Sequence, residues 1–456
     1  METMNQKHLE KMLISGAGLL ISASLINSAQ GQSADALIDK LVEKGILNVK
    51  EANELREESD KGFTSAYSVK SGLPDWVTSM KFNGDLRLRY DGIYIHPNVA
   101  DRNRMRYRLR FGFTAVIKDD FEVGLRLASG EKGSGLGAEG GGNPISSNDS
   151  FGDNASKKLL FLDLAYGKWT PINSKNWAVS LTAGKMENPF VLSDIVFDPD
   201  YTPEGLGEQL TYKFNEKHSL KFNAGQFVLD ELSGSSRDPY LVGGQLRFDS
   251  IWSPKIQTSL GVSGLAISDP ASLVNSAVPN QNRGNTRENT GTAAAPVFAL
   301  VYDYYPIVAD GTFIYTLESF PAYPGAFPLK LSVDYVYNPG APNNNEAYQL
   351  GVYIGKAGKK GTWELSYRYK TLEGDAWYEE LVDSDTGAFY QAAPVGGSSG
   401  YGAGTNLRGH TIRGQYSPFD SFTFGITYYM YDLINEFPTG SLSHANRIQV
   451  DAVWRF

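Results

Sequence analysis

The sequence lacks several features on which large classes of protein depend. None of its 456 residues is a cysteine, which excludes disulfides, thiolate metal sites and cysteine nucleophiles. The five histidines are scattered, and no grouping of His, Ser and Asp indicates a hydrolase. The formal net charge of −9 argues against a nucleic-acid partner. We therefore expect neither an enzyme nor a protein with a cofactor or a metal site.

Long apolar runs are also missing. After residue 31 no stretch of about 20 apolar residues occurs, which excludes a membrane protein built from helices. The chain is instead rich in glycine and aromatic residues, with 48 Gly, 26 Tyr and 23 Phe, and its mean hydropathy is negative. This combination suits a membrane β-barrel, in which only alternate residues need be apolar and aromatic side chains line the interfaces.

The N-terminal 79 residues are expected to contain two segments that precede the barrel. Residues 1–31 are typical of a signal peptide, because Lys7 and Lys11 precede a short apolar stretch and small residues end at Gly31, where we place cleavage. The alternative is an interfacial anchor helix. Residues 32–79 are expected to form a periplasmic helical leader, with Ser33 as a helix cap and Gly45 as a left-handed C-cap. Its role is open between packing or subunit contact and a periplasmic ligand.

Residues 80–456 predict an all-β transmembrane barrel of about 16 antiparallel strands, because short segments with alternating apolar residues recur between clusters of Gly, Asn, Asp and Pro. The expected strands lie near residues 81–93, 103–117, 121–129, 158–169, 177–187, 206–214, 219–228, 240–248, 254–266, 307–319, 328–337, 347–356, 361–371, 406–416, 421–434 and 446–456. Residues 297–305 are also strand-like, and we interpret them as a lead-in from an outer loop because Pro306 interrupts the run.

The connections between these strands alternate in length. Every second connection is a short turn, such as 118–120 or 417–420, whereas those between are long and rich in Gly, Asn and Ser, such as 130–157 and 372–405. Membrane barrels have this pattern, with short periplasmic turns and long outer loops. In a soluble β-sandwich, loop lengths are not expected to alternate in this way.

The last strand ends in an alternating aromatic pattern. Ile448, Val450, Trp454 and the terminal Phe456 share one face of the strand. A terminal Phe in such a strand resembles the signal that the barrel assembly machinery of the outer membrane reads. We therefore interpret Trp454 and Phe456 as an assembly signal.

With these features, the chain resembles the bacterial "putative porin" family of outer-membrane diffusion porins. The likeness is carried by the order along the chain of LIDKLVEKGI (37–46) with 51–58, GDLRLRY (84–90), RMRYRLRFGF (104–113), GKMENPF (184–190) and PLKLSVDY (328–335). The resemblance implies a barrel and passive transport, and the general porins imply a homotrimer. It names no substrate.

The arginine run at 104–113 predicts which face of its strand is in contact with water. Arg104, Arg106, Arg108 and Arg110 alternate with apolar residues, so all four lie on one face of a strand. An arginine facing lipid near the midplane costs about 2–4 kcal/mol. Four would cost on the order of 10 kcal/mol, comparable with the stability of a whole domain. If this strand spans a membrane, we therefore expect these side chains to face a water-filled lumen.

Two neighbouring strands add to this basic strip. The expected pore-lining residues are Arg87, Arg89, Asp91, Arg104, Arg106, Arg108, Arg110 and Arg126. A fold-back about 98–99 would set Arg89 near Arg108, Arg87 near Arg110 and Asp91 near Arg106. Such a strip attracts anions and holds them weakly. The alternative is that the arginines pair with inward carboxylates such as Asp85 and stiffen the wall.

The third outer loop is acidic and carries no basic residue. Its carboxylates are Glu187, Asp194, Asp198, Asp200 and Glu204. In general porins the third outer loop folds into the barrel and narrows it. An acidic loop that faces a basic wall would set a transverse field across this constriction and favour small polar solutes. The alternative is a loop that stays outside, where carboxylates bind divalent cations among lipopolysaccharides.

The sequence therefore predicts an outer-membrane porin of a Gram-negative bacterium, a channel for passive diffusion of small hydrophilic solutes and ions. Its expected partners are outer-membrane lipids and lipopolysaccharide, the barrel assembly machinery, and small polar solutes or anions. The alternative function is a barrel that acts mainly as a surface adhesin or structural protein.

Overall fold

The computed structural model describes residues 73–96, 101–131, 141–274, 283–387, 404–435 and 444–456. The chain divides into two units, residues 1–73 and 74–456, and the fold described here is that of the second. The predicted signal peptide and almost all of the helical leader lie outside the described residues. Within them, no helix has the length and apolarity to cross a membrane.

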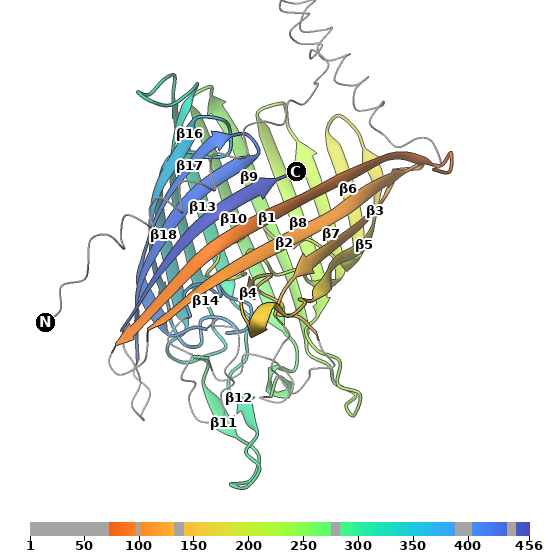
Figure 1. Cartoon of the computed structure of the whole chain (residues 1–456). Coiled ribbons are helices and arrows are strands. Elements are labelled where there is room, and N and C mark those ends of the chain that lie inside the picture. The colour runs from red at the N-terminus through yellow and green to blue at the C-terminus, as the bar shows by residue number, and fades with distance from the viewer. Residues whose placement is uncertain (1–72, 97–100, 132–140, 275–282, 388–403, 436–443) are drawn as a thin grey trace, which may run out of the picture. The chain divides into compact units, whose positions relative to one another are not determined.

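The second unit is a closed antiparallel barrel of 16 strands (Figure 1). Its strands are β1 (Val77–His96), β2 (Arg102–Ile117), β3 (Phe121–Ser129), β5 (Leu160–Asn173), β6 (Trp177–Lys185), β7 (Glu204–Lys213), β8 (His218–Val228), β9 (Tyr240–Ser253), β10 (Ile256–Ile267), β13 (Ile307–Leu317), β14 (Phe327–Tyr337), β15 (Glu346–Gly355), β16 (Thr362–Leu372), β17 (Leu407–Phe419), β18 (Phe422–Leu433) and β19 (His444–Arg455). Each pairs with its sequence neighbours in the barrel, and β19 pairs with β1 to close the ring. The predicted fold class and strand count are confirmed.

The remaining short elements belong to the outer loops. β4 (Asp149–Ser150) adds a two-residue pairing to β2, and η1 (Asp153–Ala155) and η2 (Pro270–Ser272) are single 3-10 turns. β11 (Arg287–Asn289) pairs with β12 (Phe298–Leu300) in a separate hairpin at the long-loop end of the barrel (Figure 1). The strand-like residues 297–305 therefore lie in an outer loop, as expected. The C-terminus lies at the opposite end, with the short turns.

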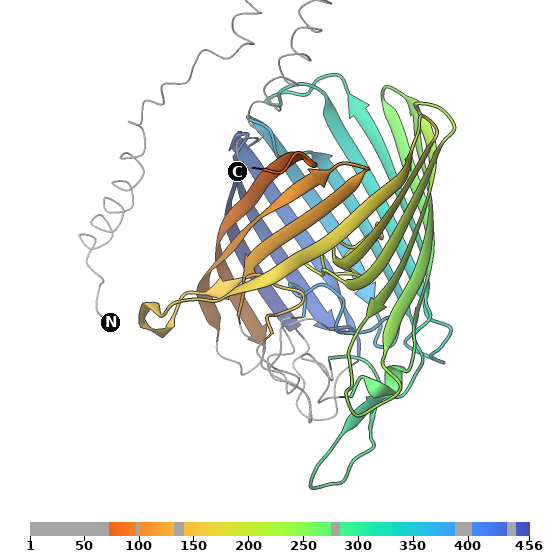
Figure 2. The same ribbon diagram turned by 90° about the vertical axis from the view of Figure 1, so that its right-hand side faces the viewer.

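The barrel carries its apolar residues outside and its charged residues inside. On β14, the side chains of Leu331 and Val333 are 53% and 49% exposed on the outer surface. The next residue, Asp334, points to the interior and is only 6% exposed. Soluble proteins have the opposite arrangement, in which large apolar side chains are buried and carboxylates are exposed. An apolar outer surface of this kind requires lipid around it. In both views the strands lie side by side and are tilted relative to the barrel axis (Figures 1 and 2).

Aromatic side chains gather where strands meet the short turns. Trp177 packs on Tyr212 with ring centroids 4.5 Å apart, and Phe422 packs on Trp454 at 4.8 Å. Aromatic rings of this kind occupy the interface between the hydrocarbon and the headgroups. The short-turn rim therefore has the character of a membrane interface.

Candidate functional site

The arginine run lies on β2 and faces the barrel interior. Arg106 is 6% exposed, whereas the adjacent Met105 is 54% exposed on the outer surface. β1 pairs with β2 so that Arg87 lies opposite Arg108 and Arg89 lies opposite Arg106. Both strands therefore present their arginines to the same wall of the interior.

The predicted register between these strands is wrong by two residues. Asp91 lies opposite Arg104 and not Arg106, because β1 and β2 fold back one residue earlier than expected. The alternation of apolar and charged residues determines which face each side chain occupies. A shift of two residues preserves every face, so the pattern alone cannot determine the register.

Most of these arginines are ion-paired with carboxylates of the wall. Asp85 accepts hydrogen bonds from Nη2 of Arg108 at 3.0 Å and from Nη2 of Arg110 at 2.8 Å. Asp91 accepts from Nε of Arg104 at 2.8 Å and from Nε of Arg447 at 2.7 Å. The strip is therefore partly neutralised by its own strands.

The β6–β7 loop, residues 186–203, is the third outer loop, and it crosses the barrel interior. Asp200 accepts from Nη1 of Arg108 at 3.2 Å and from Nη1 of Arg110 at 3.2 Å. Asp194 pairs with Arg368 and, at 3.4 Å, with Lys370, both on β16. Because β16 lies about half of the ring away from β6 and β7 in the strand order, the loop spans the lumen.

The two ends of this loop stay at its own side of the barrel. Glu187 pairs with Arg126 of β3, and Arg126 also pairs with Asp163 of β5. Glu204 begins β7, has a side chain that is 65% exposed, and pairs with Lys185 at 3.0 Å. The structure does not bring Glu204 to the arginine wall of β1 and β2.

A second inward segment was not anticipated from the sequence. Residues 373–387, which follow β16, pack against the β6–β7 loop through several hydrogen bonds, three of which end on main-chain oxygens. Asp198 N donates to Leu381 O at 2.7 Å, Asp383 N donates to Asp194 O at 3.1 Å, and Trp377 Nε1 donates to Val196 O at 2.9 Å. The Trp377 side chain is fully buried. We call residues 373–387 the β16–β17 segment.

The β16–β17 segment brings carboxylates to the same basic wall. Asp385 pairs with Arg89 at 3.3 Å and with Arg447 at 3.2 Å, and Asp383 pairs with Lys370 at 3.3 Å. Burial alone would raise the pKa of Asp385, but Arg89 and Arg447 lower it below its ordinary value. A signal for this segment exists in the sequence, since the run AWYEELV at 376–382 is too apolar for a solvated loop.

The carboxyl of Asp198 is buried between the two loops. It is 6% exposed and accepts from the backbone N–H of Asp200 and of Ser384, each at 2.8 Å. Burial and the neighbouring carboxylates of Asp200 and Asp383 raise its pKa well above the ordinary range. The carboxyl of Asp198 therefore joins the two loops through one backbone N–H of each.

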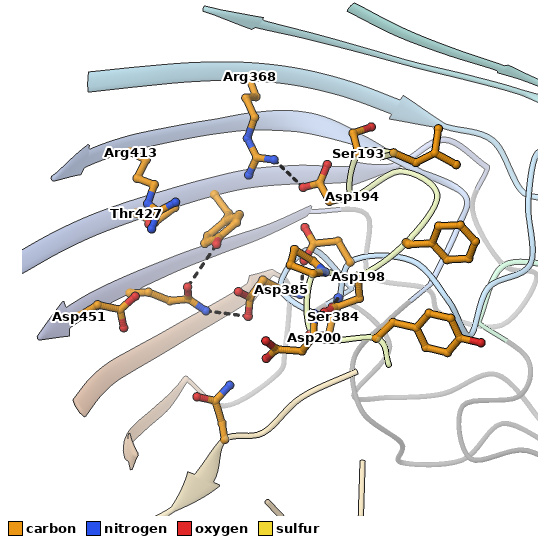
Figure 3. A pocket seen from close by; sticks show the side chains of 18 of the residues that line it. Ser193, Asp194, Asp198, Asp200, Arg368, Ser384, Asp385, Arg413, Thr427 and Asp451 are labelled. Atoms are coloured by element: carbon orange, nitrogen blue, oxygen red, sulfur yellow. Dashed lines mark hydrogen bonds and ion pairs between the residues drawn. The ribbon is translucent and has the colours of Figure 1, made fainter. Parts of the chain in front are cut away.

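The two loops enclose a cavity of about 610 Å³ against the wall (Figure 3). Its lining combines the loop carboxylates Asp198 and Asp385 with Arg368 and Arg413 of the barrel. A smaller cavity of about 180 Å³ shares Arg87, Arg108, Arg413 and Asp451 with it. Among the described residues, no group of three or more His, Asp or Glu could hold a metal ion.

The comparison with known families fits this architecture. Residues 94–299 match the family described as "Putative porin". The family resemblance is confirmed. The match contains the segments 104–113 and 184–190, whereas the segments at 84–90 and 328–335 lie outside it. Together with the barrel, this match supports an outer-membrane porin.

Several solved porin structures are similar in fold. OprB of Pseudomonas putida is 11% identical, with 83% of this chain and 94% of that chain covered and a TM-score of 0.47. The outer membrane channel DcaP of Acinetobacter baumannii is 13% identical, with 86% and 99% covered and a TM-score of 0.44. OmpF of Salmonella typhi is 9% identical, with 84% and 99% covered and a TM-score of 0.45. No curated protein matches the sequence.

Proposed function

We propose that this protein is an outer-membrane porin, a water-filled channel for the passive diffusion of small hydrophilic solutes and ions. The observation that carries the proposal is the inverted barrel, with exposed Leu331 and Val333 outside and buried Asp334 inside. Charged side chains inside a barrel with an apolar exterior are stable where water fills the lumen. The residues Arg87, Arg89, Asp91, Arg104, Arg106, Arg108, Arg110 and Arg126 would line this pore.

The β6–β7 loop and the β16–β17 segment would together form its constriction. The sequence predicted an acidic loop separated from a basic wall by the pore. Asp200 instead contacts Arg108 and Arg110 directly. Direct pairing weakens a transverse field, because the charges neutralise each other locally. We therefore expect selection for small polar solutes with a mild preference for anions.

The proposal includes export through a cleaved signal peptide at residues 1–31 and a periplasmic leader at 32–79, ahead of the barrel at 80–456. Assembly would use Trp454 and Phe456 as the signal for the barrel assembly machinery. Lipids and lipopolysaccharide would surround the apolar surface of a homotrimer. A surface adhesin is the second candidate, favoured by the β11–β12 hairpin at the outer end of the barrel (Figure 1).

Liposome swelling tests the channel directly. Proteoliposomes with the purified protein should swell in isotonic solutions of small sugars, at rates that fall as the sugar becomes larger. Boiled protein provides the control for leakage. Liposomes that swell no faster than protein-free vesicles would contradict the channel and favour the adhesin.

A further inference from the structure

Among the arginines that line the cavity of about 610 Å³, Arg87 and Arg413 are the two that form no ion pair with a carboxylate of the described residues. Arg87 on β1 donates from Nη2 to the amide oxygen of Asn148 at 2.7 Å, and its Nε has no hydrogen-bond partner. Arg413 on β17 is exposed to the interior and forms neither an ion pair nor a side-chain hydrogen bond within the described part of the chain. Neither guanidinium is therefore neutralised by a direct ion pair with a described residue.

Their neighbours are already neutralised. Arg89 is held by Asp451 through Nε at 2.7 Å and by Asp385 at 3.3 Å. Arg108 is held by Asp85 and Asp200, at 3.0 and 3.2 Å. An anion in the larger cavity therefore meets two guanidinium groups that lack an ion pair among three that have one, and the former attract it more strongly.

Arg87 and Arg413 also share one place in the pore. Both line the cavity of about 610 Å³ beside the loops and the cavity of about 180 Å³ next to it. Arg108 and Asp451 also line both cavities, so these four side chains lie where the two cavities adjoin. Small residues leave room there, since Thr423 and Gly425 of β18 line the second cavity.

We propose that Arg87 and Arg413 form a binding subsite for the oxyanion group of a small solute at this junction. A guanidinium presents N–H donors in a planar fork that matches the oxygens of a carboxylate or a phosphate group. The proposal rests on the channel function and adds the class of solute that the channel retains. Chloride, which lacks this planar pair of acceptors, passes with weaker retention.

Single-channel recording in potassium chloride, with acetate or phosphate added, tests the subsite. We expect each oxyanion to reduce the chloride current in a saturable way, and the difference between the two inhibition constants identifies the preferred group. Arg413→Gln and Arg87→Gln should each raise the inhibition constant about tenfold, as expected for loss of a charge-assisted hydrogen bond. Arg413→Lys, which keeps the charge and loses the fork, should give an intermediate value.

Arg237→Gln is the matched control, because it removes the same charge from a side chain that is 78% exposed in an outer loop. Its inhibition constants should equal those of the unmodified protein. Heat-modifiable mobility on gels verifies that every variant is folded. A conducting channel without saturable inhibition, or with inhibition that both glutamine variants leave unchanged, overturns the subsite. A protein without any conductance overturns the channel function instead.

Discussion

The backbone N–H of Asp198 donates to the carbonyl oxygen of Leu381 at 2.7 Å, and this bond joins the β6–β7 loop to the β16–β17 segment. The two partners are more than 180 residues apart in the chain. Trp377 stabilises the same contact, because its side chain is fully buried there and its Nε1 donates to Val196 O. The proposed constriction is thus a unit of two loops, each of which holds the other in place.

Trp377→Ala should widen the pore. Truncation of a buried Trp costs about 3–5 kcal/mol in a packed core, and here the loss falls on the contact between the two loops. We expect a larger and noisier single-channel conductance. Trp252→Ala is the matched control, since that side chain is 58% exposed on the barrel surface. Equal conductance for both variants would contradict the two-loop constriction.

The contact between the loops should loosen as the pH rises. The pKa of Asp198 is raised in the folded protein by burial and by Asp200 and Asp383. The folded state therefore binds the proton more tightly than the unfolded loop, so the stabilisation is present at low pH and is lost as the pH rises through the raised pKa. Asp198→Asn mimics the protonated form and should abolish this dependence.

Maleimide labelling of a Val382→Cys variant measures this opening, because Val382 is buried in the β16–β17 segment. Its labelling rate, divided by that of a Ser235→Cys variant on an exposed loop, should increase with pH. The ratio corrects for ionisation of the thiol itself. A ratio that rises equally in the Asp198→Asn background would show that Asp198 has no part in it.

The charge of the wall should determine ion preference. The double variant Arg108→Ser and Arg110→Ser leaves Asp85 and Asp200 without their cations, so the permeability ratio of chloride to potassium should fall by a factor on the order of 2–5. Asp85→Asn should move the ratio in the opposite direction. Reversal potentials in a salt gradient measure both. Unchanged potentials would assign these arginines a purely structural role.

Closure of the barrel should depend on the C-terminal residue. Phe456 and Gly84 exchange backbone hydrogen bonds of 2.8 and 3.1 Å. A Cβ at position 84 would lie 2.6 Å from the Phe456 ring and from the carbonyl oxygen of Arg110. We therefore expect Gly84→Val, like deletion of Phe456, to reduce the yield of heat-modifiable barrel severalfold. Gly414→Ala is the control, since nothing lies near its Cβ position.

The fold could be predicted from the sequence because each strand carries its own signal. Alternation over a few residues determines a strand and its two faces, so Arg106 inside and Met105 outside follow from position alone. The register of β1 and β2 did not follow, since a shift by two residues keeps both faces.

The site could be predicted only in part, because its contacts join distant segments. Arg368 and Asp194 are 174 residues apart, and no local pattern pairs them. The β16–β17 segment was missed for the same reason, although its buried Trp377 belongs to a run that is too apolar for a loop in water. Arg413 has Thr411 and Gln415, not further arginines, at the alternate positions of its strand, so nothing nearby in the sequence marked it as a solute contact.

The central claim is that the barrel is an aqueous pore, and single-channel recording in a planar bilayer tests it most directly. We predict stepwise, long-lived increases in current after addition of the detergent-purified, full-length protein, with a conductance proportional to salt concentration. A folded, heat-modifiable protein that inserts into the bilayer and gives no such steps would contradict the account.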